Sequence, residues 1–62
     1  MCEFIVFLDE EKLFEDVIYA KAIGDRVSLR DVLGRSKDIR NVKIVEVDVN
    51  SEKLVLANLH DH

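Results

Sequence analysis

Short segments rich in β-branched residues, separated by turn residues, follow one another along almost the whole chain. The clearest is VKIVEVDV at residues 42–49, in which valines alternate with acidic residues from Val45 to Val49. An alternation with a period of two is typical of a β-strand with one buried face. Val42 and Ile44 have the opposite parity, which predicts a β-bulge or burial on both faces near Ile44.

Turn signals divide the chain into five or six predicted strands. Gly24-Asp25 has glycine in the first position of a two-residue hairpin turn, and Gly34 marks a second tight turn or a bulge. The predicted strands cover residues 3–8, 14–23, 26–33, 35–39, 42–49 and 53–58. We expect an all-β fold, either a small SH3-like barrel or a curled antiparallel sheet of five to six short strands. Closing a sheet into a barrel removes its exposed edges. A helical turn within residues 8–20, after an Asp9 N-cap, is the alternative.

The length of 62 residues and the single cysteine limit how the fold can be stabilised. A chain of this size buries only about 60% of its unfolded surface, so disulfides, metals or oligomerisation usually help. One cysteine cannot form an internal disulfide, which leaves a metal, a partner subunit or a well-packed core. Hydrophobic residues make up 48% of the chain, enough for a core or a dimer interface. We expect one domain over residues 1–62, with residues 59–62 as a loose tail.

The sequence also bears on location. No apolar run approaches the roughly 18 residues that a transmembrane helix needs. The N-terminus lacks the basic region and long apolar stretch of a signal peptide. Together with the single thiol, these features predict a cytoplasmic protein with no membrane partner.

Charge is distributed unevenly along a chain whose net charge is −4. Residues 21–43 contain seven Lys and Arg against three acidic residues, whereas residues 1–20 contain one against six. The basic segment 26–43 suggests an RNA-binding module. Its candidate side chains are Arg26, Arg30, Arg35, Lys37 and Arg40. The overall acidity argues against nucleic acid as a partner, because phosphate binding draws on a positive field. The phenylalanines also lie in the acidic N-terminal third, where we expect them in the core.

Motifs typical of catalytic sites are absent from the sequence. It contains no Gly-rich phosphate loop, no HExxH and no CxxC, and Cys2 is far in sequence from both histidines. We therefore predict that the protein is not an enzyme. The His60-Asp61-His62 segment could bind a transition metal, but a frayed terminus is the expected structure.

Cys2 directly follows the initiator methionine. Removal of Met1 would leave an α-amine and a thiol on one residue, and the two can chelate a metal. Ni(II) favours square-planar or tetragonal coordination by such donors. One chain supplies too few ligands for a closed site, whereas a two-fold dimer would bring two Cys2 residues together. If Met1 is retained, this chelate cannot form, and a thiolate-only site or a site without nickel is expected. An inert or incidental cysteine is the alternative interpretation of Cys2.

Three stretches resemble the CooT family of small nickel-binding accessory proteins. They are the opening MC before an apolar strand, EDVIYAKAIGDRVSLRDVLGRSKDI, and VKIVEVDVNSEKLVLA, and they extend from Met1 to about Ala57. The resemblance implies an SH3-like barrel, a homodimer and Ni(II) bound through Cys2. It also implies a client, carbon monoxide dehydrogenase, whose maturation the protein assists. Archaeal relatives are also described as predicted RNA-binding proteins. Glu3 departs from the pattern, because an apolar residue is expected there in bacterial members.

These observations combine into one main hypothesis and two alternatives. The main hypothesis is a metallochaperone-like protein that holds Ni(II) through Cys2 at a homodimer interface. One alternative is an RNA-binding module that uses the basic segment, and the other is a protein–protein adaptor without a metal.

Overall fold

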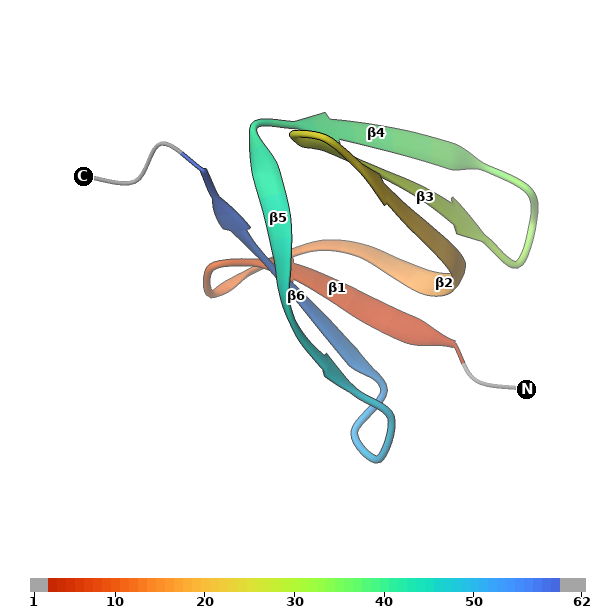
Figure 1. Ribbon diagram of the computed structural model, residues 1–62. Coiled ribbons are helices and arrows are strands. Elements are labelled where there is room, and N and C mark those ends of the chain that lie inside the picture. Colours follow the sequence, from red (N-terminus) through yellow and green to blue (C-terminus); the bar gives the residue numbers. More distant parts are fainter. Residues whose placement is uncertain (1–2, 60–62) are drawn as a thin grey trace.

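The computed structural model describes residues 3–59, and these form six β-strands and no helix (Figure 1). The strands are β1 (Phe4–Leu8), β2 (Glu11–Ile23), β3 (Arg26–Asp31), β4 (Ser36–Arg40), β5 (Val42–Asp48) and β6 (Lys53–Asn58). The predicted all-β class is confirmed. The helical alternative within residues 8–20 is wrong, because β2 begins at Glu11 and pairs with β1 from its first residue.

The strands form a single mixed sheet in the order β4-β3-β2-β1-β6-β5. Neighbouring strands are antiparallel except for β1 and β6, which are parallel. The predicted antiparallel pairing is thus observed for every neighbouring pair except this one, in which the last strand of the described chain returns beside the first. The sheet is curled but not closed: β4 and β5 are its two edges, and they leave Asn41 in different directions (Figure 1). Of the two predicted architectures, the curled sheet is the one observed.

Strand β2 is long because it pairs with two different partners. Its first half pairs with β1 as far as Val17, and its second half pairs with β3 from Val17 onward. Asp16 lies at this change of partner with a φ of 57°, and its carbonyl accepts a hydrogen bond from the Val32 N–H over 2.9 Å. A left-handed residue inside a strand bends it. The bend allows β2 to follow the curl of the sheet.

The core fills the concave side of the curled sheet. It consists of Val6, Val17, Val27, Leu29, Val42, Leu54 and Leu56. Each fully buried aliphatic side chain of this kind contributes about 1.5–3 kcal/mol relative to exposure. The predicted alternation in β3 is confirmed, since Val27 and Leu29 are buried and Arg26 and Arg30 are exposed. The predicted bulge is also confirmed: the β5–β6 register shifts between Ile44 and Glu46.

Two backbone hydrogen bonds hold the junction between β4 and β5. The Val42 N–H donates to the carbonyl of Asp25 over 3.1 Å, and the Leu59 N–H donates to the carbonyl of Asn41 over 2.8 Å. Leu59 is thus bonded to the sheet. The rest of the predicted C-terminal tail, residues 60–62, lies outside the described residues, as do Met1 and Cys2.

Candidate functional site

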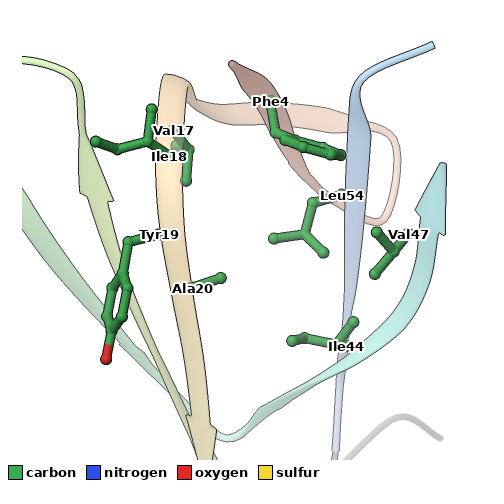
Figure 2. Close-up of a pocket in the computed structure, with 8 residues that line it drawn as sticks. All are labelled: Phe4, Val17, Ile18, Tyr19, Ala20, Ile44, Val47 and Leu54. Atoms are coloured by element: carbon green, nitrogen blue, oxygen red, sulfur yellow. The ribbon is translucent and has the colours of Figure 1, made fainter. Parts of the chain in front are cut away.

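An apolar groove opens on the concave side of the sheet, between β2 and the strands β1, β6 and β5 (Figure 2). Its volume is about 250 Å³. It is lined by Phe4, Val17, Ile18, Tyr19, Ala20, Ile44, Val47 and Leu54. In Figure 2 the side chains of Phe4, Ala20 and Leu54 point into the space between these strands, whereas the Tyr19 ring lies on the other side of β2. The side chains that point into the groove are therefore apolar.

The groove exists because β2 places small side chains on the concave side, where larger ones would fill the space. Ala20 is paired with the buried Leu29, and Ala22 with the buried Val27, yet both alanines are exposed. Their short side chains do not reach across to β5, on which Val47 remains 58% exposed. Apolar surface left open on a small protein is typical of an interaction site. The open sheet thus exposes part of what a closed barrel would bury.

The first described residues of the chain adjoin this groove. Cys2, the predicted metal ligand, lies outside the described residues. Glu3 is exposed, and Phe4, the next residue, lines the groove. Within residues 3–59, no group of three or more His, Cys, Asp or Glu side chains could hold a metal ion. The described part of one chain therefore offers no closed metal site of its own.

The structure divides the five predicted RNA-binding side chains into three settings. Arg26, Arg30 and Arg40 lie on the convex face of β3 and β4, opposite in parity to the buried Val27 and Leu29. Lys37 is paired with Leu29 and so lies on the concave face, with its Nζ 5.8 Å from the centroid of the Phe14 ring. Arg35 is bound to Asp31.

Asp31 is a buried carboxylate that organises the β3–β4 turn. Its Oδ1 accepts hydrogen bonds from the backbone N–H groups of Leu33, over 3.0 Å, and Arg35, over 2.8 Å. Its Oδ2 accepts one from the Arg35 Nε over 2.6 Å. Burial acts to raise the pKa of Asp31, but the hydrogen bonds from Arg35 and Leu33 and the positive charge of Arg35 outweigh it, so the pKa lies below its ordinary value. Arg35 is thereby committed to a structural contact.

Strand β2 adds three side chains to the convex face that the sequence did not single out, Tyr19, Lys21 and Ile23. Tyr19 is paired with Arg30, whose guanidinium carbon lies 4.5 Å from the centroid of the tyrosine ring. Lys21 is paired with Ser28. The signal was present in the sequence, because a two-residue turn at Gly24-Asp25 fixes this register. We call this surface the basic face. Its members are Tyr19, Lys21, Ile23, Arg26, Ser28, Arg30, Ser36, Asp38 and Arg40.

Fold and surface together define a small protein with a curled sheet, an open apolar groove and a separate basic face. Residues 3–59 contain no helix that is long and apolar enough to span a membrane. The family model described as CO dehydrogenase accessory protein CooT matches residues 1–57, and the chain belongs to this family. The resemblance drawn from the sequence is confirmed. At the level of the family, the protein has an accessory rather than a catalytic role in relation to CO dehydrogenase. The curated proteins include no match to the chain.

Proposed function

We propose that the protein holds Ni(II) as cargo through the Cys2 thiolate, at a homodimer interface, for delivery to maturing CO dehydrogenase in the cytoplasm. The observation that carries this proposal is the position at which β1 begins. Phe4 lines the open groove, and two residues of extended chain reach at most about 7 Å. The short connection between Cys2 and Phe4 supports a metal ligand within reach of the groove.

The groove supports the dimeric part of the proposal. Val47 and Ile18 are 58% and 47% exposed, and a second copy of the chain could cover them. A two-fold axis near the Phe4 end would bring two Cys2 residues together, because such an axis places the same residue of each chain near it. One copy has a single cysteine and no group of three candidate ligands within residues 3–59. A shared site would double the donor set.

The donors that this sequence offers suit Ni(II). After removal of Met1, the α-amine and thiolate of Cys2 form a five-membered chelate ring with a metal. Nitrogen and thiolate donors favour the square-planar geometry of Ni(II). Glu3 is exposed next to the site, so its carboxylate could add an oxygen donor or repel a thiolate pair. Glu3→Gln distinguishes these two effects by the direction in which nickel affinity changes.

The test is a titration of untagged protein, with removal of Met1 first shown by mass spectrometry. Ni(II) is added while thiolate-to-nickel absorption is followed, with Zn(II) in parallel and Cys2→Ser as the control. We expect a saturable band at one nickel per dimer that the control lacks. Identical traces for the two proteins would refute Cys2 as the ligand. Monomers that bind nickel equally well in sedimentation equilibrium would refute the shared site.

A further inference from the structure

The basic face contains two arginines placed directly opposite each other. Arg26 of β3 and Arg40 of β4 are cross-strand partners, and both are exposed. The Cβ atoms of such a pair lie about 5 Å apart, and like charges in this position destabilise a sheet. The ion pairs within residues 3–59 involve Lys12, Arg35 and Lys53, so no carboxylate within 4.0 Å compensates either of the two arginines.

A polar recess lies beside this arginine pair. It has a volume of about 340 Å³ and is lined by Ile23, Asp25, Arg26, Arg40 and Asn41. The Asp25 carboxylate is the one negative group in this lining, against two guanidinium groups. An oxyanion that enters the recess can accept hydrogen bonds from both arginines, and charge-assisted bonds of this kind are stronger than neutral ones.

At the opposite end of the basic face, an arginine contacts an aromatic ring instead of a second arginine. The Arg30 guanidinium carbon lies over the Tyr19 ring, 4.5 Å from its centroid, in a cation–π contact that favours this position of the side chain. Tyr19 is itself 42% exposed, and Ile23, the last residue of the same strand, is 51% exposed. Apolar contact area is thus available at both ends, with cationic groups between them.

We propose that the basic face is a docking surface for an acidic segment of a protein partner, whose carboxylates bind Arg26 and Arg40. Arginine and tyrosine are among the residues enriched at the energetic centres of protein interfaces. The charge of the chain disfavours RNA instead: a net charge of −4 repels a long polyanion, whereas a short acidic segment senses mainly charges within a Debye length of about 8–10 Å.

The experiment measures fluorescence anisotropy of a labelled peptide of Asp, Glu and Leu, with labelled oligouridylate RNA in parallel. We expect the wild-type protein to bind the peptide, and more tightly at low salt than at about 0.15 M. Arg26→Gln/Arg40→Gln should lose about tenfold or more in affinity. The matched control is Lys43→Gln/Lys53→Gln, which removes the same charge from β5 and β6 and should lose little. Circular dichroism checks that each variant is folded.

Three results would overturn the proposal. They are no binding of the peptide, equal losses in the two double variants, and tighter binding of the RNA than of the peptide through the same arginines. The last result would make the face an RNA-binding surface instead. The proposal does not depend on nickel, because Cys2→Ser should bind the peptide as well as the wild-type protein does. A failure of the docking proposal is therefore distinguishable from a failure of the metal proposal.

Discussion

The Arg35 Nε donates a hydrogen bond to Oδ2 of Asp31 over 2.6 Å, and the carboxylate that it contacts is buried. The same carboxylate accepts two backbone N–H groups from the turn that follows β3. One side chain therefore joins the end of β3 to the start of β4. This pair makes the stability of the fold depend on pH in a definite direction.

Asp31→Asn should destabilise the protein more at pH 7 than at pH 3. The pKa of Asp31 is below its ordinary 3.8 in the folded protein. A carboxyl group with a lowered folded pKa stabilises the fold above its unfolded pKa, and this stabilisation is lost as pH falls through the folded pKa. We expect a melting temperature about 5–10 °C lower at pH 7, with a smaller difference at pH 3. A difference that stays constant with pH would contradict this, and exposed Asp38→Asn is the control.

Arg40→Glu should stabilise the sheet. Glutamate opposite Arg26 replaces a cross-strand repulsion with an attraction, which is worth about 0.2–1 kcal/mol. Arg40→Gln removes only the repulsion and should fall between the glutamate variant and the wild type. Urea denaturation at low ionic strength measures the order of the three proteins. If the glutamate variant is the least stable, the two side chains do not interact as their register implies.

Val47→Lys should dissociate the proposed homodimer with little effect on the folded chain. Val47 lines the groove but is 58% exposed, so the substitution should change the free energy of unfolding by no more than about 0.5 kcal/mol. A lysine there would place a charge in the proposed apolar interface. Sedimentation equilibrium measures the association. The matched control is Val49→Lys, since Val49 is 60% exposed and lies in the β5–β6 turn outside the groove. Equal association of both variants would place the interface elsewhere.

Asn41→Val should destabilise the junction between the two edge strands. Asn41 has a φ of 61°, a conformation that costs a β-branched residue about 1–2 kcal/mol. Asn41→Gly should be nearly neutral, because glycine adopts positive φ readily. The hydrogen bond from Leu59 is made by the backbone carbonyl and survives both substitutions. Thermal melting compares the two variants, and equal melting temperatures would show that the left-handed conformation is not maintained.

Local patterns in the sequence predicted the parts of the fold that depend on neighbouring segments. The turn at Gly24-Asp25 places Ile23 opposite Arg26, and the change of parity at Ile44 located the bulge in β5. The start of β2 was missed, because residues 11–13 include two charged side chains and their strand conformation depends on pairing with β1. The parallel β1–β6 pair was missed for the same reason, since no local pattern specifies which distant strand lies alongside.

The candidate site was predicted in part. Three of the five basic side chains share a face, as alternation in β3 and pairing with β4 require. Lys37 has the opposite parity, and Arg35 is bound to a carboxylate whose burial no sequence pattern indicated. The apolar groove was not predicted either, because it results from small side chains on β2 facing an incompletely closed sheet. Cys2 lies outside the described residues, so its role stays a prediction.

The parallel pairing of β1 with β6 affects the order of events during synthesis. β1 lies in the middle of the sheet, yet one of its two neighbours is the last strand of the described chain. Contacts between such distant segments form late in folding, because closing the intervening loop costs entropy first. The sheet is therefore incomplete until the C-terminal strand has been made. Through that interval the start of β1 has no neighbour on one side.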